Sequence, residues 1–318
     1  MTKKKMKIFA GSNGCELAAK IAEKLGVNLG ESQLICFSEG NLFTQIKEDV
    51  SGKSVCLVQS VAHEVNDEFM ELLFWIDALK RSGVKEVAVV MPYFSYAKSD
   101  KMDGFGTSIR GRVCADCLEA VGADRLITLD LHSPQVQGFF KKPLLHLSAR
   151  PVFVNYLKQN FTKELKKAVI VSPDVGFEKT ASLYAQDLGL SLVIGEKNRS
   201  CHDEKAEVRR MFGAKVRGRL AIIVDDFTLS GGTLAATAAK LRKMGAKEVW
   251  AMVAHNLLTA QKVNELLKEN EELKYLDKLV VTDTVRAKFK KEEIKEVARE
   301  KLTEVSVAEL LVGAIETN

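Results

Sequence analysis

The feature that most constrains the fold of this chain is an internal repeat. The segment LKRSGVKEVAVVM (79–91) returns as LRKMGAKEVWAMV (241–253), with a helix end, a glycine, a charged turn and a strand in the same order. The copies begin 162 positions apart (241 minus 79), about half of the 318 residues. A chain of this length exceeds the usual size of one core. We therefore predict two similar domains, residues 1–150 and 151–318, with the last helix packing back on the first domain.

Short apolar strands alternate with helices along the whole chain. Strands are predicted at 7–11, 54–59, 86–91, 125–130, 168–172, 190–195, 219–225, 248–254 and 278–282. One helix is especially clear: Asn66 is its predicted cap, Gly83 ends it, and its apolar residues follow the helical period. Strands separated by helices imply parallel sheets with right-handed crossovers, so the predicted class is α/β with two Rossmann-like domains.

Composition excludes several classes of protein. The net charge of +5 suits small polyanions but is too weak for a nucleic-acid partner, and no basic stripe with aromatic residues supports one. No run of about 18 apolar residues is present, so no membrane partner is predicted. The basic start MTKKKMKIFAGS is followed by too short an apolar run for a signal peptide. The sequence therefore predicts a cytoplasmic protein.

Cys114 and Cys117 form a CxxC pair, a spacing that also occurs in zinc and redox sites. The surrounding SIRGRVCADCLEAVG has the pattern of an amphipathic helix, and no second CxxC is present to complete a zinc site. We expect two thiols on the face of a helix.

The segment IIVDDFTLSGGT (222–233) carries the strongest functional signal. An apolar strand is predicted to end in two adjacent carboxylates, and a loop of hydroxyls and glycines then leads into a helix. A helix start is suited to anions, and carboxylates beside it suit free hydroxyls. The pattern predicts a sugar-phosphate ligand. Neither GxxxxGK[ST] nor an early GxGxxG is present, so no P-loop or dinucleotide site is predicted.

Four segments together resemble the ribose-phosphate diphosphokinases, or PRPP synthetases. They are DLHSPQVQGFF (130–140), VSPDVGFEK (171–179), EKNRS (196–200) and VDDFTLSGGT (224–233), in the family's order and spacing. The resemblance extends from KIFAGS to about residue 315. It implies two phosphoribosyltransferase-like domains and transfer of the diphosphoryl group of ATP, or another nucleoside triphosphate, to the 1-hydroxyl of ribose 5-phosphate. It also implies Mg²⁺ as cofactor and a homo-oligomer, expected to be a hexamer of dimers.

The resemblance also implies a role for each site residue. Asp225 and Asp226 would hold the ribose hydroxyls and the metal shell. The 5-phosphate would bind the sugar-phosphate loop, which comprises Leu229, Ser230, Gly231, Gly232 and Thr233. His132 and Asp174 would be associated with the metal at the triphosphate.

Lys197 and Arg199 are the catalytic candidates implied by the resemblance. A KxR pair is common on any surface, and without the resemblance it would be taken as solvated charge. With it, a closing loop would bring two cations onto the transferring phosphoryl oxygens.

The predicted nucleotide-binding residues lie where the sequence departs from the family. They are Phe37, Glu39, Asn41, Lys98, Ser99 and Asp103. The family's YARQD is YAKSD (96–100) here. Arginine stacks on bases and makes bidentate contacts to phosphates in ways that lysine does not. The acid expected at Asn41 is missing, with one at Glu39 instead, and Leu229 replaces the usual aspartate of the sugar-phosphate loop.

These departures leave alternatives open. The chain is predicted to be an active enzyme with altered donor preference. It is otherwise a catalytically weak regulatory paralogue that binds an active partner, or a phosphoribosyltransferase.

Overall fold

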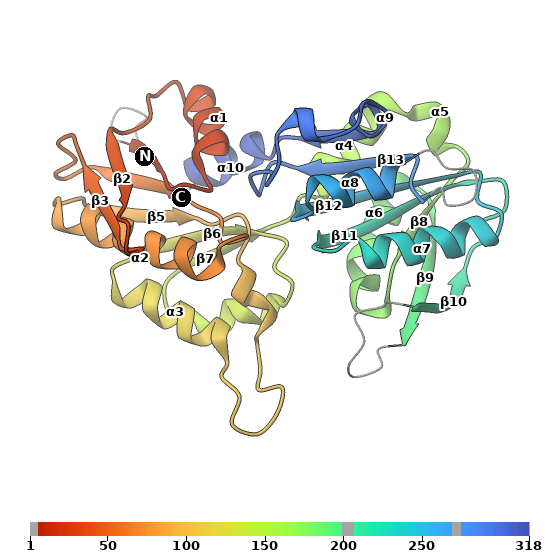
Figure 1. The fold of residues 1–318 in the computed structure, drawn as a ribbon, viewed down its shortest axis with the longest axis horizontal. Coiled ribbons are helices and arrows are strands. Elements are labelled where there is room, and N and C mark those ends of the chain that lie inside the picture. The colour runs from red at the N-terminus through yellow and green to blue at the C-terminus, as the bar shows by residue number, and fades with distance from the viewer. Residues whose placement is uncertain (1–5, 199–206, 269–274, 318) are drawn as a thin grey trace. The chain divides into compact units, whose positions relative to one another are not determined.

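The computed structural model describes residues 6–198, 207–268 and 275–317, which form two compact units (Figure 1). Unit 1 comprises Met1–Ser148, Thr284–Arg286 and Ser306–Asn318; unit 2 comprises Ala149–Asp283 and Ala287–Val305. The chain thus leaves unit 1 after Ser148, close to the boundary expected at residue 150. The last residues of the chain, Ser306–Asn318, also belong to unit 1, the domain on which the last helix was expected to pack.

Unit 1 is built on a parallel sheet with strand order β1-β4-β5-β6-β7. These strands are β1 (Met6–Ala10), β4 (Ser54–Val58), β5 (Glu86–Val90), β6 (Arg125–Leu129) and β7 (Leu144–Leu147). Helices α1 (Cys15–Leu25) and α10 (Ala308–Glu316) pack together on one face, and α2 (Val65–Arg81) and α3 (Arg110–Ala120) cover the other (Figure 1). An antiparallel hairpin of β2 (Ser32–Cys36) and β3 (Leu42–Ile46) stands beside this sheet.

Unit 2 is built on a larger sheet with strand order β10-β9-β8-β11-β12-β13-β14, parallel except for β10. Its strands are β8 (Ala168–Ser172), β9 (Ser191–Asn198), β10 (Glu207–Gly213), β11 (Leu220–Thr228), β12 (Glu248–Asn256), β13 (Lys278–Thr282) and β14 (Leu302–Val305). Its helices are α4 (Arg150–Asn160), α5 (Thr162–Leu165), α6 (Glu178–Leu188), α7 (Gly232–Lys243), α8 (Ala260–Leu267) and α9 (Glu296–Lys301). The core of unit 2 is aliphatic and that of unit 1 is mainly so, with Phe9, Phe69, Trp75 and Phe94 added, as expected for parallel strands covered on both faces.

The two units repeat the same topology. The order β1-β4-β5-β6-β7 of unit 1 corresponds to β8-β11-β12-β13-β14 of unit 2. In each unit an antiparallel hairpin, β2–β3 or β9–β10, interrupts the chain between the first two of these strands. The internal sequence repeat therefore reflects two copies of one fold.

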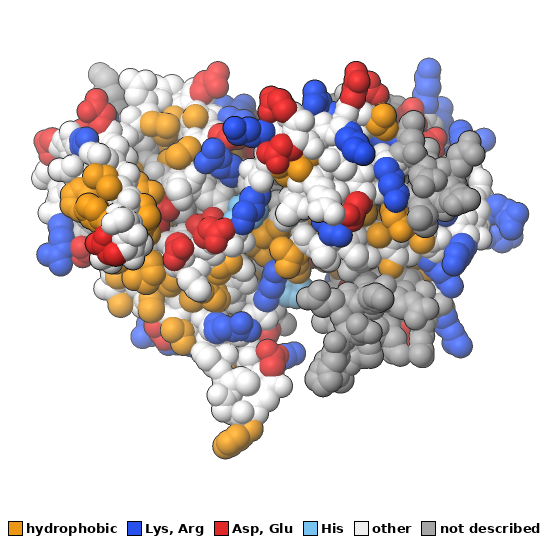
Figure 2. Space-filling model, viewed as in Figure 1, with side chains coloured by type: hydrophobic (Ala, Val, Ile, Leu, Met, Phe, Trp, Pro, Cys, Tyr) orange, Lys and Arg blue, Asp and Glu red, His pale blue; other side chains and the backbone are white. Residues whose placement is uncertain are grey.

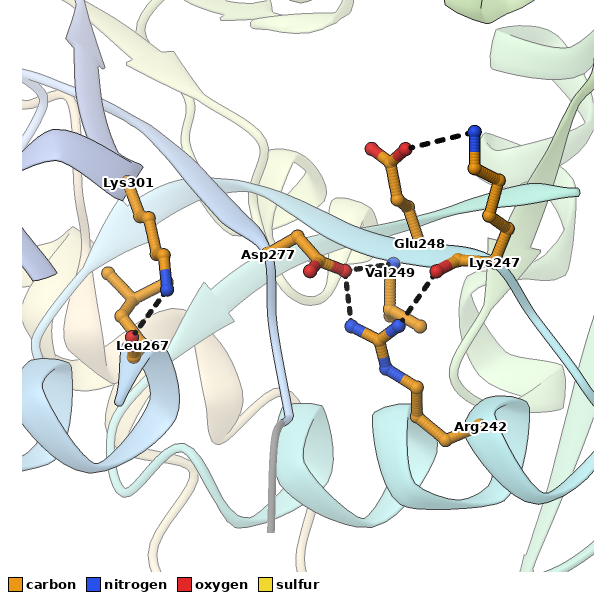
Figure 3. Close-up of polar contacts among 7 residues, drawn as sticks. All are labelled: Arg242, Lys247, Glu248, Val249, Leu267, Asp277 and Lys301. Atoms are coloured by element: carbon orange, nitrogen blue, oxygen red, sulfur yellow. Dashed lines mark hydrogen bonds and ion pairs between the residues drawn. The ribbon is translucent and has the colours of Figure 1, made fainter. Parts of the chain in front are cut away.

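The repeated segment has the same pattern of contacts in both units. In unit 2, the Asp277 carboxylate accepts hydrogen bonds from the Arg242 guanidinium and from the Val249 N–H, the latter at 2.8 Å (Figure 3). In unit 1, the Asp124 carboxylate accepts from Lys80 Nζ and from the Val87 N–H, both at 2.8 Å. Each aspartate ties the end of a helix to the start of the next strand, which fixes the turn between them.

The nine predicted strands are all present, and the α/β class is confirmed. Strands β2, β3, β7, β10 and β14 were not predicted. The helix α2 begins at Val65, and its N-cap is Glu64 without a side-chain hydrogen bond, so the predicted capping role of Asn66 is wrong. The predicted end of α2 is close to the observed one, since Gly83 follows it with a left-handed φ of 77°.

The CxxC pair lies on α3, as the amphipathic pattern predicts. Cys114 is buried and Cys117 is half-buried. Burial raises the pKa of the Cys114 thiol to about 12, so this thiol is a poor nucleophile at neutral pH.

Candidate active site

The segment from β11 into α7 holds the sugar-phosphate loop, and it differs from the prediction at one point. The strand does not end at the acidic pair, because β11 pairs with β12 as far as Thr228 opposite Asn256. Its pairing with β8 on the other side stops at Ile223 opposite Val171. The acidic pair therefore lies where β11 extends beyond β8, at the carboxyl edge of the sheet, where parallel sheets bind ligands.

Asp225 and Asp226 are adjacent in sequence but project to opposite faces of β11, as successive strand residues do. Asp226 is 8% exposed, and its Oδ1 accepts the Phe227 N–H at 2.8 Å. Asp225 is half-buried, and its Oδ1 accepts the Asp226 N–H at 3.1 Å. The alternation explains how two neighbouring carboxylates fit into one strand without facing each other.

The sugar-phosphate loop is held from behind by α8. Gly231 is buried with a φ of 75°, and a Cβ there would lie 2.9 Å from Leu266 Cδ1. The Gly232 N–H donates to Ser230 Oγ at 3.3 Å. Leu229 at the start of the loop is 60% exposed. Because α7 begins at Gly232, the first N–H groups of this helix have no partners within the helix and favour an anion.

The exposure of Leu229 leads to a first testable prediction. If a carboxylate at this position contacts a ribose hydroxyl, Leu229→Asp will tighten ribose 5-phosphate binding or raise activity. The change is tolerated structurally because the side chain is mostly solvated. Calorimetric titration of both proteins with ribose 5-phosphate measures the difference. Weaker binding by the variant would instead show that the loop is adapted to an apolar residue.

Asp174 follows β8 in a hydrogen-bonded turn of unit 2. Its Oδ1 accepts the Phe177 N–H at 3.2 Å, and its backbone oxygen accepts from Ser172 Oγ at 2.6 Å. The adjacent strand β9 passes very close, since a Cβ on Gly195 would lie 2.6 Å from the Pro173 oxygen. Only glycine therefore lets β9 approach the turn that carries Asp174.

Lys197 lies near the end of β9, where its backbone pairs with Val208 of β10. The side chain of Lys197 and the whole of Arg199 lie outside the described residues. The strand β9 directs this end of the chain toward the same edge of the sheet as Asp174, because β8 and β9 are parallel.

His132 follows β6 in unit 1, as predicted, and its side chain is exposed. Asp130, which precedes it, has a φ of 34°, in the left-handed region that residues other than glycine rarely adopt. Ser148 Oγ donates to Asp130 Oδ1 at 2.8 Å, and the Leu131 N–H donates to His146 Nε2 at 2.9 Å. Neither Ser148 nor His146 was singled out in the sequence, because β7 is too short to show a strand pattern.

The predicted nucleotide residues Phe37, Glu39 and Asn41 lie at the tip of the β2–β3 hairpin. Phe37 is 46% exposed, and its ring centroid lies 6.4 Å from that of Phe43. The Phe37 N–H donates to the Asn41 oxygen at 2.8 Å, and Asn41 Nδ2 donates to Glu39 Oε1 at 3.3 Å. Hydrogen bonds from the Glu39 backbone and from Asn41 lower the pKa of Glu39, so this carboxylate is ionised.

Lys98, Ser99 and Asp103 lie on a second loop of unit 1, and their surroundings differ. Lys98 Nζ lies 5.6 Å from the centroid of the Tyr93 ring, within cation–π distance. Asp103 is exposed. Ser99 is only 2% exposed, and its Oγ accepts the Arg110 N–H at 3.3 Å, so its side chain holds the base of the loop together.

Unit 1 has its own loop at the position of the sugar-phosphate loop, between β4 and α2. There the Glu68 carboxylate accepts the backbone N–H groups of Ala62 and His63, the latter at 3.1 Å. Glu68 is 8% exposed and also accepts from Asn13 Nδ2 at 2.9 Å. A carboxylate of the protein thus binds the loop N–H groups of unit 1, whereas the glycines of the sugar-phosphate loop occur only in the second copy of the repeat.

The repeated sheet order, with a sugar-phosphate loop at the second strand of one copy, defines a two-domain phosphoribosyltransferase-like protein. Two family models match the chain: the N-terminal domain of ribose phosphate pyrophosphokinase over residues 6–122, and the phosphoribosyl synthetase-associated domain over residues 210–317. A crystal structure of phosphoribosylpyrophosphate synthetase from Mycobacterium smegmatis is similar, with a TM-score of 0.84 and 31% identity over 98% of this chain and 97% of that chain.

Curated relatives agree with these matches over nearly the full length. The ribose-phosphate pyrophosphokinase of Aquifex aeolicus is 38% identical over 98% of this chain and 94% of its own. That of Bacillus caldolyticus is 36% identical over 98% of this chain and 93% of its own. The chain therefore belongs to the ribose-phosphate pyrophosphokinase family.

Within the described ranges, no helix is both long enough and apolar enough to cross a membrane.

Proposed function

We propose that this protein transfers the β,γ-diphosphoryl group of ATP, or of another nucleoside triphosphate, to the 1-hydroxyl of ribose 5-phosphate. The product would be PRPP, a substrate for nucleotide biosynthesis. The observation that carries the proposal is the segment Asp225–Thr233, where two carboxylates of β11 lead into a glycine loop at the start of α7. Carboxylates can accept hydrogen bonds from the hydroxyls of a sugar, and the neighbouring helix start can bind its phosphate, so the pair suits a sugar phosphate. The family and the names of its members support the same reaction.

Each site residue then has a chemical role. Asp225 and Asp226 accept hydrogen bonds from the ribose hydroxyls, and the sugar-phosphate loop binds the 5-phosphate. Lys197 and Arg199 stabilise the negative charge that spreads over the transferring group in the transition state. Phosphoryl transfer depends mainly on such positioning and electrostatic stabilisation, because the protein itself forms no bond to the group.

Mg²⁺ is the cofactor that we infer, arriving with the nucleotide. Among the described residues, no cluster of three or more His, Cys, Asp or Glu side chains is arranged to hold a metal ion. Mg²⁺ usually keeps several waters and binds through one or two carboxylates and the substrate phosphates, so it needs no such cluster. The half-buried Asp174 offers such a carboxylate in unit 2, and the exposed His132 offers an imidazole in unit 1. The metal would neutralise charge on the triphosphate.

The hairpin tip and the loop around Lys98 would recognise the nucleotide. The exposed Phe37 ring provides a flat apolar surface for a base, as aromatic side chains do in many base-binding sites. Lys98 already contacts the Tyr93 ring, and a lysine cannot make the bidentate hydrogen bonds to a phosphate that an arginine makes. We therefore infer a looser preference among nucleotide donors than an arginine would give.

The direct test is an assay with ribose 5-phosphate, Mg²⁺ and each common nucleoside triphosphate. We expect a nucleoside monophosphate to appear only when ribose 5-phosphate is present, with several donors active. No turnover with any donor would point to the regulatory paralogue, whose binding to an active relative can be measured. Consumption of PRPP in the presence of a free base would point to the phosphoribosyltransferase.

A further prediction concerns activation by inorganic phosphate. Ser51 and Gly106 stand where the family's resemblance places two anion-binding arginines. The Ser51 N–H donates to Asp49 Oδ1 at 2.9 Å, and Lys53 Nζ donates to the Asp49 backbone oxygen, so the nearby lysine already has a partner. Because bidentate guanidinium contacts are absent at both positions, we expect activity that does not require phosphate.

Steady-state rates in a phosphate-free buffer, with and without added phosphate, check this expectation. ADP should inhibit only by competition with the donor. Strong activation by phosphate, or ADP inhibition that saturating donor does not relieve, would show that an allosteric anion site is present.

We also infer that the protein is a cytoplasmic homo-oligomer, expected to be a hexamer of dimers. Figure 2 shows hydrophobic side chains gathered over the β2–β3 hairpin and α2. Phe43 of β3 and Met70 and Phe74 of α2 are 41%, 43% and 38% exposed, and apolar side chains that gather on a surface mark protein–protein contacts. Sedimentation velocity measures the assembly, and a monomer at working concentrations would contradict this inference.

A further inference from the structure

The turn that follows β6 is strained at one residue. Within residues 6–198, 207–268 and 275–317, Asp130 is the only residue other than glycine with a positive φ. Such conformations persist only where the surrounding contacts impose them, and they often occur at functional sites. His132 lies two residues beyond this strained position, so whatever imposes the turn also sets the place of His132.

Three hydrogen bonds from β7 and the residue after it hold this turn. The Asp130 N–H donates to the Leu147 oxygen at 2.9 Å, which is an ordinary contact between neighbouring strands. Ser148 Oγ donates to Asp130 Oδ1 at 2.8 Å. The third bond runs from the Leu131 N–H to His146 Nε2 at 2.9 Å. The acceptor for the Leu131 N–H, directly before His132, is thus a side chain of β7 and not a backbone oxygen.

The hydrogen bond from Leu131 fixes the chemical form of His146. A backbone N–H can only donate, so Nε2 must be the unprotonated nitrogen of a neutral ring that carries its proton on Nδ1. Burial lowers the pKa of His146, which favours the neutral ring at physiological pH. Gln137 Nε2 donates to the Pro134 oxygen at 2.9 Å and lies 3.4 Å from Nδ1; both of these nitrogens carry hydrogen, so this contact is packing and not a hydrogen bond. The ring is therefore bonded through Nε2 to the residue directly before His132.

We infer that His146 is a positioning residue for the donor nucleotide: by accepting the Leu131 N–H it fixes the strained turn that presents His132. The inference rests on the proposed role of His132 at the metal–triphosphate. It assigns His146 no contact with substrate. Residues that orient a ligand-binding side chain typically change affinity or activity by about 10–100-fold when they are replaced.

Two substitutions separate positioning from packing. His146→Leu places a side chain of similar size at this position but removes the acceptor. His146→Gln restores an acceptor, because its Oε1 is as many bonds from Cα as Nε2 of histidine. Leu145→Ala is the matched control, since Leu145 is the neighbouring residue of the same strand on its opposite face.

We expect His146→Leu to lower kcat/KM for the nucleotide by about 10–100-fold. The KM for ribose 5-phosphate should stay unchanged, because the sugar-phosphate loop belongs to unit 2. His146→Gln should recover most of the loss, and Leu145→Ala should show none. Equal losses for both substrates, or failure of glutamine to recover the activity of a folded variant, would overturn the inference.

Nuclear magnetic resonance tests the same contact without any assay of activity. In the wild-type protein, the imidazole nitrogen shifts of His146 should report a proton on Nδ1 and none on Nε2. The Leu131 amide resonance should move in His146→Leu and return in His146→Gln. A proton on Nε2, or a Leu131 amide resonance that stays unchanged in both variants, would overturn the inference. If the protein turned over no donor at all, the proposed function would fail while these spectra still decided the role of His146.

Discussion

Lys197→Ala will lower turnover by about a thousandfold, while ribose 5-phosphate will still bind. The reason is that Lys197 is proposed to act on charge that develops only in the transition state, whereas the sugar phosphate is held by the loop at the start of α7. Steady-state kinetics and calorimetric titration with ribose 5-phosphate measure the two effects separately. The loss should appear in kcat, because ground-state binding is left intact.

Lys243→Ala is the control for this experiment. Lys243 is an exposed lysine in the last turn of α7, so its removal changes the net charge by the same amount. Turnover should be unaffected by this control. A Lys197→Ala protein with normal turnover would mean that the end of β9 takes no part in catalysis, and the diphosphoryl-transfer proposal would lose its main catalytic group.

Gly231→Ala will weaken ribose 5-phosphate binding by about tenfold or more. A left-handed conformation costs a residue other than glycine about 1–2 kcal/mol. In addition, the new Cβ would lie 2.9 Å from Leu266 Cδ1, so the loop or α8 must shift. Either adjustment displaces the N–H groups that are proposed to bind the 5-phosphate. Calorimetric titration measures the loss of affinity.

The neighbouring glycine provides a comparison for stability. A Cβ on Gly232 would have Ser230 Oγ as its nearest neighbour, at the ordinary contact distance of 3.4 Å, and Gly232 has no positive φ. Gly231→Ala should therefore lower the unfolding temperature, and Gly232→Ala should leave it nearly unchanged. Equal unfolding temperatures for the two variants would show that the left-handed conformation of Gly231 is not required.

The fold was largely predictable because its signals are local. Buried parallel strands such as β5 and β12 are continuous apolar runs, and the repeat shows that the two belong to equivalent places. Strands β2, β3 and β10 were not predicted, because each lies at the edge of its sheet and lacks a continuous apolar run. The capping prediction at Asn66 was wrong because a polar residue near a helix start is compatible with several starting positions.

The candidate site was predictable only in part. Most of its proposed residues, such as His132, Asp174 and Asp226, lie just after or near the end of a strand, in motifs that are read directly from the sequence. The extension of β11 beyond Asp226 was not foreseen, since it depends on pairing with β12 and not on residue type. His146 accepts a hydrogen bond from the backbone N–H of Leu131, and Glu68 accepts one from the backbone N–H of His63. No pattern of residue types in the sequence reveals such contacts.

The central claim is that an intact diphosphoryl group moves to the sugar. Phosphorus-31 magnetic resonance of the protein with ATP, Mg²⁺ and ribose 5-phosphate follows this directly. We predict that AMP accumulates together with a pair of coupled diphosphate resonances attached to the ribose, and that no ADP forms. Accumulation of ADP with a single new phosphoryl group on the sugar, or release of free pyrophosphate without a new sugar diphosphate, would contradict the claim.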